Sequence, residues 1–163
     1  MKKCLLTALG LLISLNLQAR ETVEQTSLSL AGAMKAAQAA QRFCQGKGYA
    51  VAVAVVDRSG RLLALLRDEK AGPHTVDSSW RKAYTALSLR HPTHKLAELV
   101  VKDPKIRDLG RMNEKILLLG GGLPITEARQ VVGGIGVGGA PGAMLDVACA
   151  RAGLRALRGR DEE

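Results

Sequence analysis

The stretch VVGGIGVGGAPG, residues 131–142, decides how the chain is interpreted, because its glycines fit two different structures. Residues 134–139 match G-x-G-x-x-G, the pattern that joins a strand to a phosphate-binding helix in dinucleotide-binding folds. That fold needs a second parallel strand after the helix, with an acid about 20 residues further on. Here only a short tail containing Asp161 follows the helix-like segment. We therefore expect no dinucleotide site.

The glycines instead predict a strand that something approaches closely. Glycine weakens a strand, and it is retained where another backbone, a flat ligand or a neighbouring subunit comes near. Bulges and tight bends alone are the alternative interpretation. On the first interpretation Gly136 and Gly138 lie against a ligand, and the free N–H groups of a helix starting near Pro141 suit an anionic group.

The first 19 residues have the pattern of a secretory signal peptide. Lys2 and Lys3 precede an uncharged apolar run over residues 5–15, and Ala19 is a small residue at a plausible cleavage point. The run is shorter than the roughly 20 residues of a membrane span. We expect a periplasmic or secreted protein with no stable membrane span, with a flexible segment over 20–27, one domain over 28–158 and a tail over 159–163.

The charge pattern disfavours nucleic acid as a partner. The formal net charge is +9, but lysine and arginine are scattered, and aromatic residues make up 2% of the chain. Nucleic-acid-binding surfaces usually combine a basic face with stacking aromatics. Small anionic ligands stay possible, because arginine and lysine suit carboxylates.

Two cysteines follow the signal segment, Cys44 and Cys149. Export would permit a disulfide between them, and two buried free thiols are the alternative. If the first and last helices lie together on one sheet face, the two sulfurs come close.

Hydrophobic spacing predicts an α+β domain. Residues 30–45 form a helix, with Leu30 on its buried face, and strands near 50–57 and 61–67 form a hairpin whose turn Asp57 caps. A helix capped by Thr75 or Asp77 runs to about residue 89, and a short one starts at Thr93. Residues 115–139 predict three strands, and a helix follows Pro141. Because hairpins dominate, the sheet is expected to be mostly antiparallel with helices on its faces.

Five ordered stretches resemble one family. GGGLPI (120–125), VVGGIGVGGAPG (131–142) and LDVACARAGLRAL (145–157) resemble the GlcG/HbpS-like haem-binding family, also called the haem-degrading domain family, and AVAVVDRSGRLLALLRD (52–68) and RKAYTAL (81–87) match its earlier motifs. The resemblance implies a profilin-like fold with a five-stranded antiparallel sheet, a homo-oligomer, and haem or a related tetrapyrrole as ligand. The chain departs from the family at residues 127–129, which lack an Asp-Gly-like turn pair, and at Gly138, where many members have serine.

Haem requires an axial donor, apolar walls and cations for its propionates. His74 is the best-placed imidazole for the iron, in a loop that enters a helix; an exposed loop histidine is the alternative. Arg81 and Lys82 could bind propionates or acids of a neighbouring subunit, or be solvated, and Thr85 offers a weak oxygen donor. The predicted cofactor site is His74, Arg81, Lys82, Thr85, Gly136 and Gly138.

Zinc and catalysis are disfavoured. His91 and His94 have a zinc-like spacing, but Pro92 prevents one helix from carrying both, and no third ligand is evident. No nucleophile–base set, no carboxylate pair in an apolar setting and no P-loop is recognisable; Asp68 and Glu69 are adjacent acids, but they lie at a strand end. We expect an exported, oligomeric haem-binding protein with a carrier, sensor or protective role. The alternatives are an enzyme or enzyme accessory acting on a small carboxylate such as a 2-hydroxy acid, and a purely structural oligomer.

Overall fold

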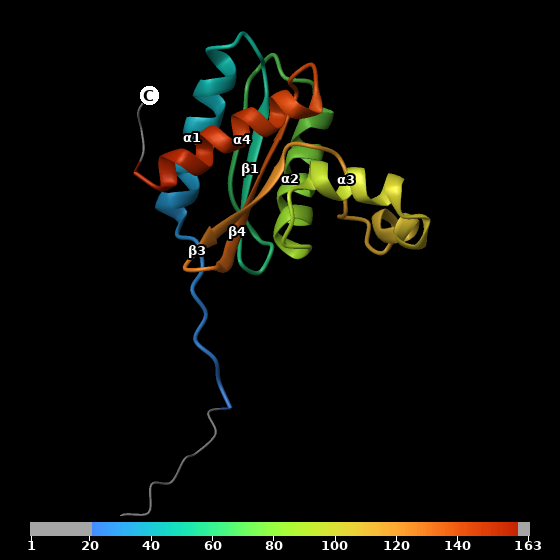
Figure 1. The fold of residues 1–163 in the computed structure, drawn as a ribbon. Helices are drawn as coiled ribbons and strands as arrows, with labels where there is room; N and C mark the ends of the chain where they lie inside the picture. The colour runs from blue at the N-terminus through green and yellow to red at the C-terminus, as the bar shows by residue number, and fades with distance from the viewer. Residues whose placement is uncertain (1–20, 160–163) are drawn as a thin grey trace, which may run out of the picture.

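A computed structural model describes residues 21–159 as a single antiparallel sheet between helices (Figure 1). The signal-peptide prediction over residues 1–19 lies outside the described residues. The sheet has the order β2-β1-β4-β3, and all three neighbouring pairs are antiparallel. Its strands are β1 (Ala52–Asp57), β2 (Leu62–Arg67), β3 (Gly122–Glu127) and β4 (Gln130–Gly138). The α+β prediction is therefore confirmed.

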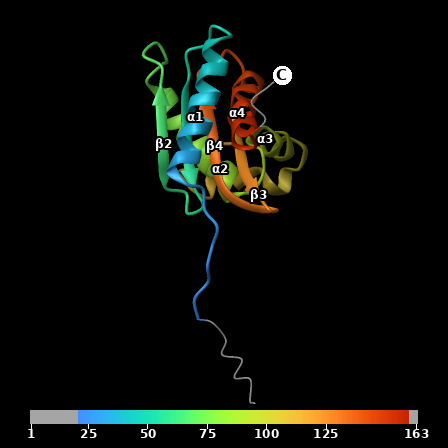
Figure 2. The ribbon, with the colours of Figure 1, turned by 90° about the vertical axis from the view of Figure 1, so that its left-hand side faces the viewer.

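Helices cover both faces of the sheet. The first face carries α1 (Leu30–Gln45) and α4 (Ala143–Leu157), which lie side by side in front of the strands in Figure 2. The second face carries α2 (His74–Ser88), which packs mainly on β4. The short helix α3 (Thr93–Lys102) and the 3-10 helix η1 (Pro104–Arg111) lead from α2 back toward β3. The start of α2 lies beside the loop that follows β4, and its end lies beside the β1–β2 and β3–β4 turns.

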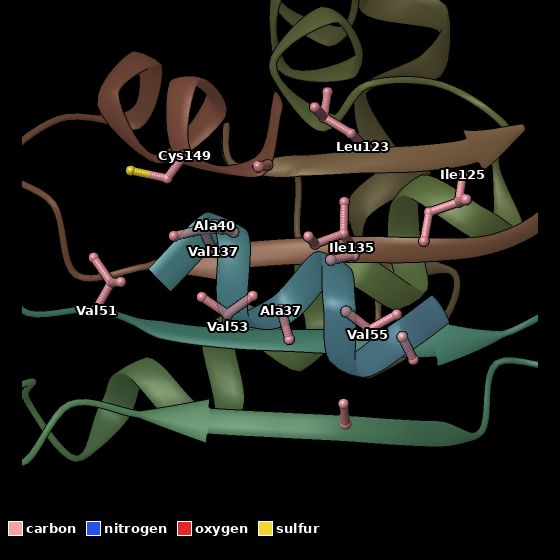
Figure 3. Close-up of a cluster of buried hydrophobic side chains, with 14 of the residues drawn as sticks. Ala37, Ala40, Val51, Val53, Val55, Leu123, Ile125, Ile135, Val137 and Cys149 are labelled. Atoms are coloured by element: carbon pink, nitrogen blue, oxygen red, sulfur yellow. The ribbon is translucent and has the colours of Figure 1, made fainter. Parts of the chain in front are cut away.

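The core lies between the sheet and α1 (Figure 3). Val53, Val55 and Ile135 are fully buried there. The helix side of this layer is small: the buried face of α1 consists of Ala33, Ala36, Ala37, Ala40 and Cys44. Small side chains let the helix axis lie close to the strands and to α4. Leu30 was predicted on this face, but it is 58% exposed, because the alanine stripe already fills the space.

Helix starts differ from the predicted ones at α2 and α4. Pro73 precedes the first residue of α2, and neither Thr75 nor Asp77 caps it; both lie within the helix. Proline suits a helix start, because it has no N–H to leave unpaired. The helix α4 begins at Ala143, two residues after Pro141.

The prediction that Asp57 caps the β1–β2 turn is confirmed. Asp57 Oδ1 accepts hydrogen bonds from the N–H groups of Ser59 and Arg61.

The prediction of five strands is wrong for residues 21–159, and four strands do not confirm the profilin-like label. The apolar run at 116–119 forms no strand, and side chains of α2 hydrogen-bond two of its backbone groups. Thr85 Oγ1 accepts from the N–H of Leu117 at 2.8 Å, and Arg81 donates to the carbonyl of Ile116 at 3.0 Å. These two backbone groups therefore have hydrogen-bond partners without pairing to a neighbouring strand.

The glycines of β4 seat α2. A Cβ at Gly134 would collide with the carbonyl of Ala83, and one at Gly136 would collide with the carbonyl of Ser79. Each contact would be under 3.0 Å, a separation that real Cβ atoms essentially never show. The close approach predicted for this strand is confirmed, but the approaching group is the backbone of α2. A flat ligand against Gly136 is therefore excluded by the chain's own helix.

The predicted meeting of Cys44 and Cys149 is also confirmed, as a disulfide that joins α1 to α4. Their Cα atoms are 5.6 Å apart, and the residues are 105 positions apart in sequence. Both cysteines are buried in the core. The bond closes a loop that contains the whole sheet and α2, so it restricts the unfolded chain strongly.

Reduction is expected to destabilise the fold by about 4–5 kcal/mol, the loop-entropy value for a closed loop of this length. Urea unfolding with and without dithiothreitol measures the difference. The double variant Cys44→Ala/Cys149→Ala is the control, and its unfolding should not respond to reductant. Coincident curves for the wild-type protein in both conditions would contradict this expectation.

Candidate functional site

A cleft opens where β4 ends and both α2 and α4 begin. Its volume is about 260 Å³. The lining comprises His74, Ser78 and Lys82 of α2, Leu119, the loop 138–142, and Ala143 and Asp146 of α4. Three of the predicted cofactor residues are thus brought together: His74 and Lys82 from α2, and Gly138 from the end of β4.

The α2 wall of this cleft is one stripe of the helix. His74, Ser78 and Lys82 are spaced four residues apart, so their side chains share a face. His74 lies exposed at the start of the helix, and among residues 21–159 no hydrogen bond reaches either of its ring nitrogens. An imidazole in this position is open to a ligand. The predicted role of His74 as iron donor stays a prediction.

The floor of the cleft is a buried ion pair. Lys82 Nζ donates to Asp146 Oδ2 and to the carbonyl of Val137, both at 2.9 Å. Asp146 Oδ1 accepts from the N–H of Ala140 at 3.0 Å. The residues are only 2% and 4% exposed, and Lys82 was predicted to be solvated or to bind propionates or a neighbour's acids. That expectation is wrong, because the Lys82 ammonium group is already bound by Asp146 and the Val137 carbonyl of the same subunit.

Burial and the neighbouring groups act in opposite directions on the charge of Asp146. Burial raises the pKa of Asp146, while the Lys82 ammonium and the Ala140 N–H act in the opposite direction. Gly121 has a φ of 122°, and a Cβ there would press on Asp146 and on Lys82 Nζ. A glycine is therefore required beside the pair. The pair ties α2 to the first turn of α4 across the end of β4.

Arg81 and Thr85 lie outside the cleft. Arg81 donates to Asp77 at 3.4 Å and to the Ile116 carbonyl, and its Nε is buried without a hydrogen-bond partner. Thr85 donates to the carbonyl of Arg81 at 2.7 Å and is fully buried. These two side chains hold the segment after η1 against α2. Gly136 lies beneath α2 and does not line the cleft.

The other two histidines, His91 and His94, do not line the cleft that contains His74. His91 Nδ1 lies 3.3 Å from the carbonyl of Leu89 on the surface. His94 is buried with no partner for Nδ1, and burial lowers its pKa. In the part of the chain that the structure describes, no group of three histidine, cysteine or acidic residues could hold a metal ion.

No helix within residues 21–159 has both the length and the apolar character to cross a bilayer.

Asp146 is the site residue that sequence reasoning missed. The available signal was its position as the single acid in the segment AMLDVACARAGLRAL, residues 143–157. An acid in the otherwise apolar first turns of a core helix needs a buried partner. Lys82 supplies that partner from 64 residues away, a distance that local patterns do not reveal.

Fold and cleft together define a small α+β domain with a cleft at the end of its sheet. Residues 28–155 match the family described as "Haem degrading protein HbpS-like", and the chain belongs to that family. The resemblance expected from the motifs is therefore confirmed.

Solved structures extend the comparison. A double mutant of HbpS from Streptomyces reticuli is 39% identical, with a TM-score of 0.77, over 96% of this chain and 99% of that one. The protein ORFY from Klebsiella pneumoniae is 29% identical, with a TM-score of 0.82, over 89% and 99%. PduOC, solved as a heme complex, is 25% identical, with a TM-score of 0.74, over 80% and 95%.

Breaking the ion pair is expected to cost more than replacing it. Lys82→Met leaves a buried carboxylate without its cation, and we expect a loss of about 3–5 kcal/mol in unfolding free energy. The double variant Lys82→Met/Asp146→Leu should recover most of this loss, because no uncompensated charge is left. Urea unfolding of both variants measures the difference. A single variant as stable as the wild-type protein would rule out the pair as the tie between α2 and α4.

Proposed function

We propose that this protein is exported, self-associates and binds haem or a related tetrapyrrole in the His74 cleft. The observation that carries the proposal is the unbonded imidazole of His74 at the rim of a cleft, in a chain of the HbpS-like family that is similar to PduOC, which was solved as a heme complex. A neutral imidazole nitrogen is a common axial donor to haem iron.

The residues around the cleft fit an apolar, flat ligand at its mouth. Leu119 lines the cleft and is 46% exposed. Met144 and Leu145 are outside the lining but follow the lining residue Ala143 in α4, and they are 54% and 38% exposed. Exposed apolar side chains close to a hollow are typical of binding surfaces. His74 would hold the iron and these side chains would cover part of the macrocycle. When bound, haem supplies an iron centre whose ligand binding and redox chemistry depend on the axial donor.

A second copy of the chain would complete the site. A cleft of about 260 Å³ is smaller than the roughly 300–1,000 Å³ of ordinary small-molecule pockets, so one subunit encloses only part of a tetrapyrrole. An apolar groove also runs between the edge strand β2 and α2, lined by Leu62, Leu65, Val76 and Trp80 among others. This uncovered edge supports the proposal of a homo-oligomer.

Export is supported by two features of different kinds. Residues 1–19 have the signal-peptide pattern described above. The Cys44–Cys149 disulfide suits an oxidising compartment such as a periplasm or the cell exterior.

Titration with haemin tests the proposal. The wild-type protein should shift the Soret band with an end point at stoichiometric haemin, and His74→Ala should lose the low-spin imidazole signature. The control is His91→Ala, which removes an exposed imidazole away from the cleft. No Soret shift in the wild-type protein would reject haem binding, and an unchanged spectrum in His74→Ala would reject the assigned donor.

A small carboxylate is the second candidate ligand for the same cleft. The helix α4 begins at the cleft with Gly142 before its first residue and no side-chain cap; Leu145 and Asp146 donate to the Gly142 carbonyl, and no side chain caps the N–H groups of Ala143 and Met144. Such a helix terminus suits an anion. Thermal-shift measurements with glycolate and lactate separate this candidate from haem.

A further inference from the structure

A second cleft lies at the opposite end of α2, and the proposed function does not use it. Its volume is about 350 Å³. Three segments form it: the β1–β2 turn, the end of α2 with the residues that follow it to Arg90, and the β3–β4 turn with the start of β4. The lining residues are Arg58, Ser59, Gly60, Tyr84, Leu87, Ser88, Arg90, Arg129, Gln130 and Val131.

Each of the three segments contributes one arginine. Arg58 is partly buried and held in place, because its Nη1 donates to the carbonyl of Thr26 and to Gln130 Oε1. Arg90 and Arg129 are exposed, and among residues 21–159 neither guanidinium group makes a hydrogen bond or an ion pair; the backbone N–H of Arg90 donates to the carbonyl of Leu87. The cleft therefore presents one fixed and two free guanidinium groups, which are suited to bidentate recognition of an oxyanion.

No acidic side chain lines the cleft to neutralise these cations. The nearest carboxylates in sequence are Asp57, whose Oδ1 accepts from the N–H groups of its own turn, and Glu127, which is exposed two residues before Arg129; neither belongs to the lining. Lys115 adds positive charge beside the cleft, because its Nζ lies 5.6 Å from the centroid of the Tyr84 ring. Three arginines in one hollow without an acid repel one another, and an anion would relieve that repulsion.

The backbone around the cleft is in a conformation that its residues disfavour. In the part of the chain that the structure describes, the non-glycine residues with positive φ are Arg90, Ala128 and Arg129, at 55°, 45° and 65°. A tight hairpin turn with two such residues usually carries Asn-Gly or Asp-Gly. Strain of this kind persists where function retains it. At positions 90 and 129 an arginine stands where glycine would stabilise the turn.

We propose that this cleft binds a small organic phosphate. Guanidinium groups from three separate segments suit the tetrahedral oxygens of a phosphoryl group better than the two coplanar oxygens of a carboxylate. The hydroxyls of Ser59 and Ser88 supply further hydrogen bonds. The Tyr84 ring, Leu87 and Val131 form an apolar wall for the organic part of the ligand.

Thermal-shift and calorimetric titrations with phenyl phosphate, inorganic phosphate and malonate, at constant ionic strength, test the proposal. Phenyl phosphate should raise the Tm of the wild-type protein and bind more tightly than phosphate, and malonate should bind most weakly. Arg129→Gly and Arg90→Gly should each weaken phenyl phosphate binding about tenfold or more. Both should raise the Tm of the unliganded protein, because glycine tolerates positive φ.

The opposite signs of these two effects separate binding from folding. If the arginines only supported the fold, their replacement would lower Tm, and that result would overturn the proposal. Arg107→Gln, on η1, is the matched charge control and should keep wild-type affinity. Equal shifts with sodium chloride, or tighter binding of malonate than of phenyl phosphate, would also overturn it. Haemin titration of Arg129→Gly should match that of the wild-type protein, so failure of one proposal leaves the other standing.

Discussion

The fit of α2 onto the side-chain-free part of β4 is the constraint on which the rest of the structure depends. The carbonyls of Ser79 and Ala83 lie where the Cβ atoms of Gly136 and Gly134 would otherwise be. Backbone against backbone brings the helix axis closer to the sheet than side chains on the strand would permit. Lys82 then reaches past the strand end to Asp146, which locks α2 to α4 on the other face. The disulfide Cys44–Cys149 closes that other face by joining α4 to α1.

This seating of α2 creates both clefts, because each end of the helix meets loops from the sheet. At its start, the loop after Gly138 and the first turn of α4 form the hollow with His74 at the rim and the buried ion pair as its floor. At its end, the two hairpin turns bring Arg58 and Arg129 beside Arg90. The first cleft is neutral at its floor and apolar at its mouth, whereas the second is cationic. One domain therefore has two clefts whose linings differ in charge.

The sequence predicted the elements whose signals are local. Two apolar runs on either side of the Asp57 turn predicted the β1–β2 hairpin, and hydrophobic spacing over residues 30–45 predicted α1. Features that depend on distant partners were mispredicted or missed. The run at 116–119 is apolar enough for a strand, but Thr85 and Arg81 hydrogen-bond two of its backbone groups. A lysine on a helix is usually solvated, so the sequence did not predict the burial of Lys82. Its ion pair with Asp146 is what makes that burial possible. The glycines of β4 predicted a close approach without identifying the helix that makes it.

The unfolding free energy of Gly136→Ala tests the seating of α2 most directly. A methyl group at this position would push the helix off the strand, and we expect a loss of at least about 2 kcal/mol in urea unfolding, the scale of an overpacked core. Gly46→Ala is the matched control, because the nearest atom to its added Cβ is the Arg42 carbonyl oxygen at 3.4 Å and its φ is −63°. A Gly136→Ala protein as stable as this control would contradict the account.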